Sequence, residues 1–362
     1  MYITDFQIVR PRFERSQEEI LDWISRAHGH RKDVTFTEEL RQKLFSLGLG
    51  DQKIQKRGFH LEDCNHLDWE RMQIYNVEES DRGSTLDHRM AAFDEAASEM
   101  LEQLYPEGAP LPSQLIHTTC TGYIAPSPAQ KLVARRKART MVTHAYHMGC
   151  YGAIPSVRMA MGHVATESGD AEVVHTELCS LHMNPSLHST EQLVVQSLFA
   201  DGCIKYRVSQ EAGVGLEVVA IHEEIIPGTE TKMTWDPKST GFHMTISKDI
   251  PVLLRRALGP YLSRLSEKVK GFDPATALFA IHPGGPKIIE QIADFLKLKD
   301  TQVSHSKEIL RNFGNMSSGT IPHVWQAMVE DDAVADDQPI VSLAFGPGLS
   351  ISGGLMIKRR SA

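Results

Sequence analysis

The stretch YHMGCYGAIPSVRMAMG, residues 146–162, places Cys150 between two glycines. An apolar-leaning segment that predicts a strand precedes the cysteine, and a segment that predicts a helix follows it. A thiol at such a junction lies near the positive end of the helix dipole, which favours the thiolate. Gly149 and Gly152 permit a sharp turn and a close approach of substrate. The stretch therefore predicts a strand–helix unit with Cys150 as a candidate nucleophile; a small buried residue is the alternative.

Strands and helices alternate on both sides of this stretch. Earlier in the chain, the apolar pattern predicts a strand at residues 1–9 and helices at residues 16–27, 38–47 and 85–104. A strand that runs into a loop is predicted at residues 111–128, a strand at 171–183 and a helix at 189–202. Beyond residue 214 the pattern starts again, with strands at 215–227 and 241–250, a helix at 251–269, a strand at 274–285 and a helix at 286–298. The pattern ends with a helix–turn–helix at residues 304–331 and two strands at residues 338–358. Alternation in both halves predicts an α/β fold.

Composition narrows the class of protein. The 362 residues are 41% hydrophobic and 23% charged, which is typical of a globular chain with an ample core. A formal net charge of -8 disfavours nucleic acid as a partner. The five cysteines are spread without a CxxC pair, which predicts a reducing compartment. The first 19 residues carry charges where a signal peptide needs an apolar core, and no apolar run approaches the ~20 residues of a membrane span. We therefore expect a cytoplasmic protein without a membrane partner.

Two later segments provide partners for Cys150. IHPGGP places His282 at the end of a predicted strand, ahead of two glycines and a helix. FGNMSSGT places Asn315 in a turn between two predicted helices. A cysteine, a histidine and an asparagine, each on a loop after an ordered element, form a candidate catalytic triad. Each histidine or asparagine alone is more often structural, but together, in glycine-rich segments, they indicate a site.

The chain resembles the type III polyketide synthases, the chalcone-synthase-like branch of the thiolase superfamily. The segments HMGCYGA, QSLFADG, IHPGGPKI with GNMSS, and FGPGL carry the resemblance, which spans about residues 110–355. The resemblance implies a thiolase fold with five αβαβα layers from two related halves, residues 1–220 with the nucleophilic cysteine and residues 221–362 with the histidine and the asparagine. It also implies a homodimer.

The resemblance implies a specific reaction. Cys150 would accept the acyl group of a starter acyl-CoA, and His282 would keep the thiolate ionised by ion pairing. His282 and Asn315 would then hydrogen-bond the thioester oxygen of malonyl-CoA and stabilise the enolate formed when CO2 leaves. Repeated attack of the enolate on the acyl thioester gives a polyketide, which cyclises to a pyrone, resorcinol or phloroglucinol-type product. No metal or redox cofactor is implied, because loss of CO2 drives the condensation.

The resemblance also assigns cavity residues. Phe199, in QSLFADG, matches the gatekeeper between the CoA tunnel and the cavity, with a core aromatic as the alternative. The other cavity positions are Cys120, Cys179, Met244, Ser317, Gly346, Pro347 and Gly348, with Leu181 or His182 beside Cys179. For Cys120 and for the Gly-Pro-Gly turn, a structural role is an equal alternative. Ala125 stands where plant enzymes carry the methionine that crosses the dimer interface. These departures from plant chalcone synthases predict a different cavity and a product other than chalcone.

The family places its CoA-binding lysines and arginines just before the segment that matches IQKRGFH. At two of those positions this chain has Leu44 and Leu47. The candidates nearby for binding the CoA phosphates are Arg41, Lys43, Lys53 and Lys56. A further basic run, at residues 131–139, is better explained as a solvated surface than as a CoA-binding site.

Four other functions fit parts of the pattern. A ketoacyl synthase III-like enzyme of fatty-acid synthesis shares the fold and the triad but makes one condensation with carrier-bound malonate. An inactive acyl-binding protein of the thiolase fold is the alternative that is not an enzyme. A papain-like protease needs its cysteine in a C-G-S-C-W type motif near the mature N-terminus, which Cys150 does not have. A metal site at His144, His147 and Cys150 is disfavoured, because residues three apart on a strand point to opposite faces.

Overall fold

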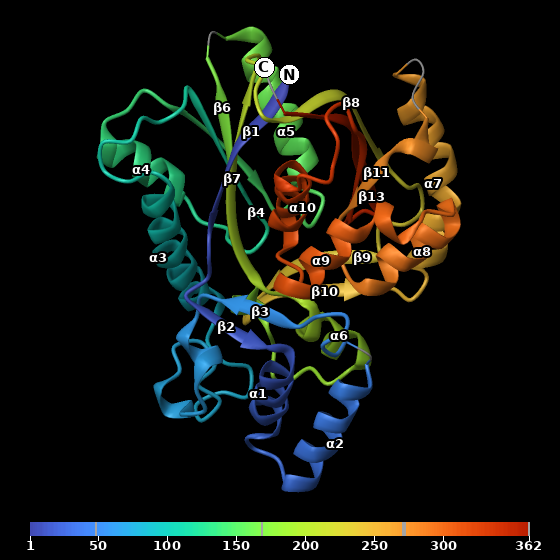
Figure 1. Ribbon diagram of the computed structural model, residues 1–362. Helices are drawn as coiled ribbons and strands as arrows, with labels where there is room; N and C mark the ends of the chain where they lie inside the picture. Colours follow the sequence, from blue (N-terminus) through green and yellow to red (C-terminus); the bar gives the residue numbers. More distant parts are fainter. Residues whose placement is uncertain (48, 168, 270–272, 361–362) are drawn as a thin grey trace.

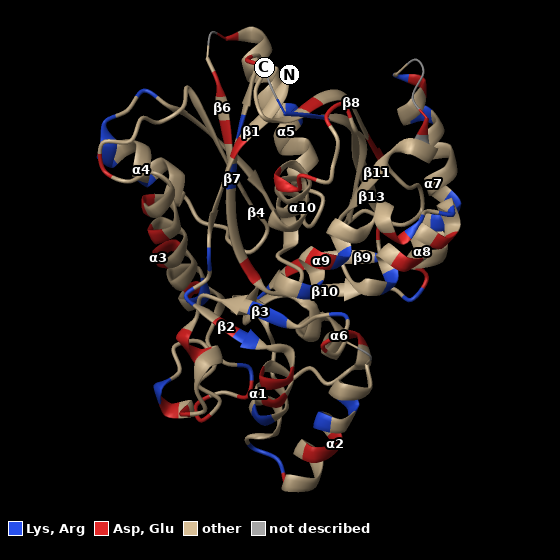
Figure 2. Cartoon of the chain, in the orientation of Figure 1, with Lys and Arg blue, Asp and Glu red and all other residues tan. Residues whose placement is uncertain are grey.

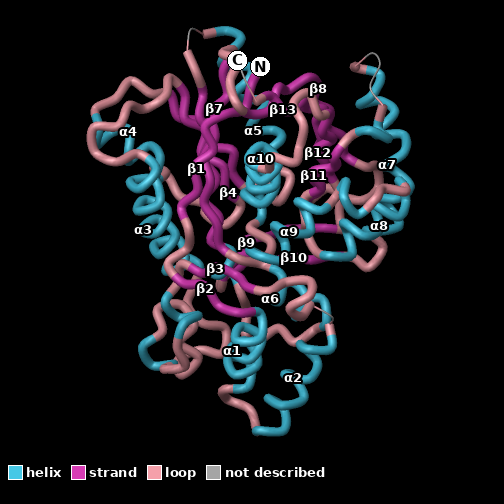
Figure 3. Tube along the Cα trace, viewed as in Figure 1, coloured by secondary structure: helices cyan, strands magenta, loops and turns pink. Residues whose placement is uncertain are grey.

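The computed structural model describes residues 1–47, 49–167, 169–269 and 273–360 and is built around a central sheet (Figures 1 and 3). The N-terminal part of the sheet consists of β1 (Tyr2–Val9), β4 (Gln114–Thr119), β5 (Met141–Tyr146), β6 (Ala171–Leu178) and β7 (Asp201–Ser209). The C-terminal part consists of β8 (Gly215–Ile225), β11 (Leu278–Ile281), β12 (Pro339–Gly346) and β13 (Ser350–Arg359). These described strands form one nine-stranded sheet in the order β11-β12-β13-β8-β1-β7-β6-β4-β5.

Helices lie outside both parts of the sheet and also between them (Figure 1). The larger helices are α3 (Leu86–Leu104), α4 (Pro128–Arg136), α5 (Ala153–Thr166), α7 (Ile250–Glu267), α8 (Pro286–Leu296), α9 (Ser304–Phe313) and α10 (Thr320–Glu330). α5 and α10 each contact β7 and β13, so they form the central layer. α3 packs on β1 and β6 with α4 against it, and α7 packs on β8 and β13 with α8 against it. This arrangement confirms the expected five layers.

The two parts of the sheet are joined at one end only. β1 pairs with β7 along most of its length but pairs with β8 only through Tyr2 and Ile3. Beyond these residues the two parts diverge and enclose α5 and α10, whose apolar side chains fill the central core. These two helices carry few charged residues, whereas the outer helices carry many (Figure 2). The predicted boundary between the two halves, at residue 220, lies inside β8, a strand of the C-terminal part of the sheet.

A smaller lobe lies at one end of the sheet (Figure 1). It contains α1 (Gln17–Gly29), α2 (Val34–Ser46), α6 (Thr190–Leu198), β2 (Phe13–Ser16) and β3 (Lys56–Phe59), and the hairpin of β9 (Met233–Lys238) and β10 (Gly241–Ile246) packs nearby. Ser16 caps α1 by accepting a hydrogen bond from the Glu19 N–H at 3.2 Å. The lobe matters for function because both cavities described below lie between it and the layered body.

Most predicted elements are confirmed within a few residues, but one helix ends earlier than predicted, and the sequence analysis did not predict β2, β3, α4, β7 or β9. The helix predicted through QSLFADG ends at Leu198, so Phe199 lies outside α6. β7 follows at once, and the apolar pattern did not single it out as a strand. Its residues are buried on both faces of the sheet, so the alternation that marks a half-buried strand is absent.

Among the described helices, none combines the length and the apolar character needed to cross a membrane.

Candidate active site

Cys150 lies in the turn between β5 and α5, as the sequence predicts. The turn is closed by a hydrogen bond from the Gly152 N–H to the Gly149 carbonyl at 3.0 Å. Gly149 has a φ of 82°, a conformation that side chains disfavour, so glycine is required there. The Cys150 side chain is 7% exposed, which places the thiol inside the protein at the wall of a cavity.

His282 and Asn315, which belong to the C-terminal half, line the same cavity as Cys150. His282 follows β11, and its backbone N–H donates to the Leu343 carbonyl at 2.7 Å. Asn315 follows α9, and its backbone pairs with that of Phe199 in an isolated parallel bridge. The structure thus brings the three candidate triad residues, with Phe199, onto the wall of one cavity.

This outer cavity is mainly apolar. Its lining consists of Cys150, Phe199, His282 and Asn315 with Leu47, Leu49, Lys53, Val194, Leu198, Met233, Met244, Ile246, Ile250, Leu254, Gly284, Gly285, Pro286, Lys287, Ile288, Glu290 and Phe345. An apolar pocket with a few convergent polar groups is the usual form of a small-molecule site. The polar groups here are those of the triad on one wall and Lys53, Lys287 and Glu290 elsewhere.

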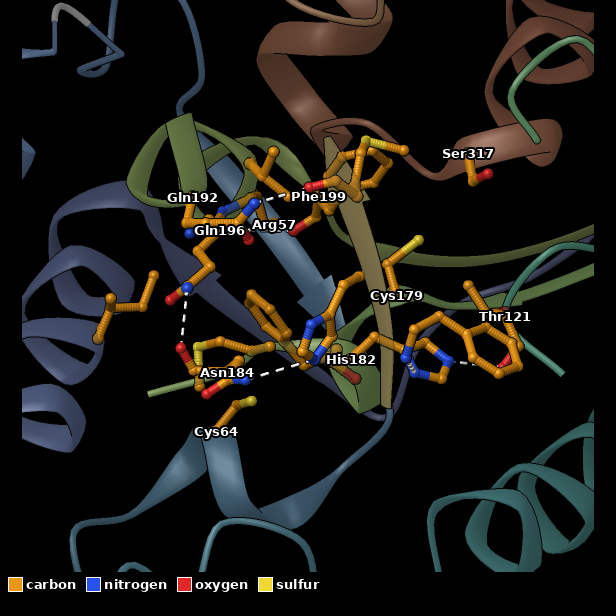
Figure 4. Close-up of a pocket in the computed structure, with 18 of the residues that line it drawn as sticks. Arg57, Cys64, Thr121, Cys179, His182, Asn184, Gln192, Gln196, Phe199 and Ser317 are labelled. Atoms are coloured by element: carbon orange, nitrogen blue, oxygen red, sulfur yellow. Dashed lines mark hydrogen bonds between the residues drawn. The ribbon is translucent and has the colours of Figure 1, made fainter. Parts of the chain in front are cut away.

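A second, inner cavity lies on the other side of Phe199 (Figure 4). Of the predicted cavity residues, Cys120, Cys179, His182, Met244 and Ser317 line it. In the close-up, Ser317, Cys179 and Thr121 lie on one side of the cavity, and Gln192 and Gln196 on the other. Phe199 and Met244 line both cavities, so their side chains form the partition between them. Leu181 is buried in the core instead.

Burial sets the charge state of the nucleophile. It raises the pKa of the Cys150 thiol to about 12, although hydrogen bonds from Ser317 and Asn315 act in the opposite direction. Burial also lowers the pKa of His282 to about 3. Within the described part of the chain, neither ring nitrogen of His282 has a hydrogen-bond partner. Desolvation therefore outweighs the helix dipole, and it favours the neutral thiol and the neutral imidazole.

Hydrogen bonds fix the orientation of the Asn315 amide. Its Oδ1 accepts from the Ser317 N–H at 2.9 Å and from the Thr320 hydroxyl at 3.3 Å. Its Nδ2 donates a long bond, 3.4 Å, to the Gly284 carbonyl. Because the acceptor atom is already occupied, the amide presents its N–H group to the cavity. Asn315 is therefore suited to donate a hydrogen bond to a substrate oxygen.

The Gly-Pro-Gly turn lies under the nucleophile. A Cβ built on Gly149 would lie 2.6 Å from Cδ of Pro347, and the turn also contacts Tyr151 through Gly346. Gly346, Pro347 and Gly348 line neither of the two cavities. Their contact with the site is therefore through the turn that holds Cys150, which agrees with the structural alternative for this motif.

The four cations proposed to bind CoA phosphates lie in different places. Lys53 lines the outer cavity, where it pairs with Glu290. The other three hydrogen-bond elsewhere: Arg41 to Asp22 at 3.1 Å, Lys43 to the carbonyl of His188 at 3.2 Å, and Lys56 to Glu14 at 2.8 Å. Lys287, at the start of α8, also lines the outer cavity, and the sequence analysis passed over it. The CoA-binding assignment stays a prediction, with Lys53 the best placed of the four.

The remaining candidates lie outside the two cavities. Ala125 is exposed, close to Tyr123, whose side chain is 68% exposed. His147 follows β5, and its Nε2 donates to the Trp235 carbonyl at 2.7 Å. His144 stacks on the ring of Tyr146. In residues 1–47, 49–167, 169–269 and 273–360, no group of three or more His, Cys, Asp or Glu side chains is arranged to hold a metal ion.

One buried group was missed by the sequence analysis. Glu177, in β6, is 0% exposed and forms no ion pair with any described residue. Its carboxylate accepts hydrogen bonds from Cys120 N–H at 3.1 Å, from the Thr121 hydroxyl at 2.8 Å and from the Ser318 hydroxyl. The available signal was the charged glutamate within the predicted strand VVHTELC, because glutamate is almost never fully buried unless it is paired.

Comparisons with known proteins agree with this architecture. Residues 217–359 match the family model for the C-terminal domain of chalcone and stilbene synthases. The chain is 26% identical over 240 residues to 1,3,6,8-tetrahydroxynaphthalene synthase of Streptomyces coelicolor. It is 28% identical over 255 residues to the alpha-pyrone synthesis polyketide synthase-like Pks18 of Mycobacterium tuberculosis. These alignments cover 65% and 67% of this chain, and they span 64% of the length of each relative.

The likeness extends to solved structures. PKS-I from the brown alga Ectocarpus siliculosus superposes with a TM-score of 0.85, at 22% identity, over 99% of this chain and 98% of that chain. At this identity the superposition shows a shared fold. It covers both halves of the sheet, whereas the family model covers only the C-terminal half.

Proposed function

We propose that the chain is a type III polyketide synthase of the chalcone and stilbene synthase family, and that it condenses malonyl-CoA onto an acyl-CoA starter held on Cys150. The observation that carries the proposal is the meeting of Cys150, His282 and Asn315 on one wall of the outer cavity. A nucleophile and two hydrogen-bond donors around one space are what an acyl carrier and an enolate site require.

The first step is loading of the starter. The acyl-CoA enters the outer cavity, and the Cys150 sulfur attacks the thioester carbonyl. His282 takes the thiol proton as the new bond forms between that carbon and Sγ. It passes the proton to the CoA sulfur when the bond between the carbon and that sulfur breaks, and CoA leaves as a thiol. The apolar wall of Leu198, Ile250 and Leu254 supports binding of the pantetheine arm by excluding water.

Decarboxylation of malonyl-CoA is the second step. The Asn315 amide and a ring N–H of neutral His282 donate hydrogen bonds to the thioester oxygen, which becomes the enolate oxygen when CO2 leaves. A neutral imidazole suits this role because it carries one N–H donor. The enolate carbon then attacks the acyl group on Cys150. No cofactor is needed for this step, because the departing CO2 provides the driving force.

The partition between the cavities supports repeated extension. A growing chain on Cys150 passes Phe199 and Met244 to reach the inner cavity, where Cys120, Cys179 and Ser317 form part of the wall. The shape of that wall directs cyclisation to a pyrone, resorcinol or phloroglucinol-type product. We also propose that the protein forms a homodimer, with Ala125 and the exposed Tyr123 on the interface. The cytoplasmic location stays a prediction.

Replacing the nucleophile tests the proposal. Cys150→Ala is expected to abolish both acyl loading and product formation, because no other thiol of the described residues lines the outer cavity. Mass spectrometry of the intact protein and of products, after incubation with malonyl-CoA and short, long or aromatic acyl-CoAs, measures both. Cys203→Ala is the matched control, since Cys203 is fully buried in β7 and lines neither cavity. Chain extension by Cys150→Ala would refute the assignment, and turnover only with carrier-bound malonate would favour the ketoacyl synthase III-like alternative.

A further inference from the structure

We propose that the guanidinium of Arg57 binds an oxygen atom of the β-keto chain that grows into the inner cavity. This inference rests on the proposed function, in which that chain is held on Cys150 and passes Phe199. Arg57 lies in β3, in the smaller lobe, and no step of loading or decarboxylation uses it. By holding one oxygen, Arg57 selects the fold of the chain and therefore the ring that the chain closes.

Arg57 brings a charge into a cavity that otherwise has none. It is 1% exposed, and among the described residues that line the inner cavity it is the only lysine, arginine, aspartate or glutamate. Burial lowers the pKa of Arg57 to about 9, so the side chain is still a cation at neutral pH. A buried charge is costly unless it is paired, so an unpaired one beside a cavity is a candidate for binding a ligand.

Protein groups account for two of the three guanidinium nitrogens. Nε donates to Oε1 of Gln17 at 2.8 Å. Nη1 donates to the backbone carbonyls of Gln196 at 2.9 Å and of Phe199 at 2.7 Å, close to the end of α6 (Figure 4). Nη2 has no hydrogen-bond partner among the described residues. The hydrogens of Nη2 are thus the ones that a ligand can use.

The groups whose charges act on Arg57 do not take up its free nitrogen. Oδ1 of Asp201 accepts from the Ser180 N–H at 2.8 Å, and Oδ2 accepts from the His60 N–H at 2.7 Å and from the Ser180 hydroxyl at 2.6 Å. Burial raises the pKa of the Cys64 thiol, so that thiol is not an anion at neutral pH. In the described part of the chain, Arg57 therefore has a charge of nearby sign to attract it but no ion-pair partner.

Arg57 is held beside the partition between the two cavities. The carbonyl at 2.7 Å belongs to Phe199, one of the two residues of the partition, and Arg57 lines the inner cavity but not the outer one. The arginine stem packs on Gly314, where a Cβ would lie 2.9 Å from Cγ of Arg57. A chain that has passed Phe199 therefore lies next to the guanidinium as it enters the inner cavity.

The number of free nitrogens indicates the kind of oxygen that fits. A carboxylate is bound best by parallel N–H groups of two nitrogens, whereas here Nη2 alone is free. The single oxygen of a ketone or an enolate needs only one nitrogen. A β-keto chain has an oxygen on every second carbon, and a CH2 group between two carbonyls is acidic enough to form an enolate. The inferred ligand is therefore a 1,3-dicarbonyl unit in its ketone or enolate form.

Two small ligands test this site without any turnover. Triacetic acid lactone is a cyclised β-dicarbonyl whose acidic enol is ionised at neutral pH, and its O-methyl ether has a similar shape without the charge. Isothermal titration calorimetry on the full chain measures their binding. Quenching of tryptophan fluorescence locates them, because Trp23 and Trp235 line the inner cavity and no described tryptophan lines the outer one. We expect the lactone to bind at least ~10-fold more tightly than the ether, the effect of a hydrogen bond to a charged group.

Replacing Arg57 should remove this preference. Arg57→Met keeps a long apolar stem but has neither charge nor N–H groups, so it should bind the two ligands with equal affinity. Arg57→Lys has one nitrogen, for which the carbonyls near the end of α6 compete, and should lose most of the preference. Leu193→Ala is the matched control for lost stability in α6, because Leu193 is fully buried and lines neither cavity. This control should keep the preference, and melting temperatures compare the stability of the variants.

Each outcome decides for or against the site. Equal binding of the two ligands by the wild type would overturn the proposal, and so would a full preference in Arg57→Met or Arg57→Lys. If Arg57→Met does not fold, Arg57→Lys decides. Loss of the preference in Leu193→Ala as well would show that it follows stability and not the guanidinium, which overturns the proposal equally. Neither ligand is a thioester and Cys150 takes no part in the measurement, so these results stand whether or not the polyketide assay succeeds.

Discussion

At the scale of single residues, Asn315 and His282 differ in how firmly the fold fixes the orientation of their side chains. Both are buried, but only Asn315 has its orientation determined by hydrogen bonds from Ser317 and Thr320. The His282 ring has no partner among the described residues, so its orientation is left to the substrate. A donor fixed in advance stabilises a developing oxyanion without any cost of reorganisation. The effect of replacing Asn315 on the enolate step can therefore be predicted more definitely than the effect of replacing His282.

Asn315→Ala should lower malonyl-CoA decarboxylation about 100-fold, the usual effect of removing one oxyanion donor, and lower starter loading much less. The reason is that the enolate needs the amide hydrogen, whereas attack by Cys150 on the starter does not need it in full. CO2 release and acyl-enzyme formation are measured separately, the second by mass spectrometry. Asn312→Ala, in the preceding helix α9, is the control. Equal losses in both steps would contradict this division of labour.

At the scale of elements, the site depends on a contact between two turns. The turn that carries Cys150 joins β5 to α5 in the N-terminal half, and the turn between β12 and β13 packs against it from the C-terminal half. The approach is close enough that Gly149 has no room for a side chain beside Pro347. Both halves of the fold therefore help to fix the position of Cys150.

Gly149→Ala should therefore reduce acyl loading of Cys150 strongly while most of the protein stays folded. The new methyl group would meet Pro347, and a φ of 82° is strained for alanine, so the turn must shift. Loading is followed by mass spectrometry and folding by the melting temperature. Gly162→Ala is the matched control: Gly162 lies in α5 with no atom near its Cβ position, so alanine should stabilise by up to about 1 kcal/mol. Normal loading in Gly149→Ala would show that the turn tolerates displacement.

At the scale of the whole molecule, buried histidines link stability to pH. Burial lowers the pKa values of His28 and His323 to about 4 and those of His117, His175, His182 and His282 to about 3. In the unfolded chain these groups titrate near the ordinary value of 6.5. Between those values the unfolded state binds more protons, so the free energy of unfolding falls as the pH falls below about 6.5. Asp201, with its pKa raised to about 6, and Glu177 act in the opposite direction but are fewer.

The melting temperature should consequently fall when the pH is lowered from 7.5 to 5.5 at constant ionic strength. Each buried histidine contributes roughly 1 kcal/mol per pH unit once its unfolded form is protonated. Together they reach several kcal/mol, a large part of an ordinary unfolding free energy of about 5–15 kcal/mol. Differential scanning fluorimetry measures the fall, and His323→Gln, which removes one of these groups, should reduce it. A melting temperature that stays constant or rises on acidification would contradict this account.

Local patterns in the sequence were enough to predict the α/β class and the strand-to-helix turn at Cys150, whereas the five layers were expected from the family resemblance. Apolar periodicity and glycine are local signals, and they act over a few residues. β7 and the end of α6 were not predicted, because a strand buried on both faces loses its alternation and because Phe199 is held by pairing with Asn315. The buried Glu177 was missed in the same way, since its partners lie in other strands and turns.

Sequence patterns alone indicate the α/β class, the three candidate triad residues and the resemblance to a family. The partition of two cavities by Phe199 and Met244 and the support of the Cys150 turn by the Gly-Pro-Gly turn follow from contacts between segments far apart in the sequence. Burial in the folded chain also favours the neutral thiol of Cys150 and the neutral imidazole of His282. The physical reason is that contacts between distant segments, and the desolvation that sets a pKa, arise only when those segments pack together.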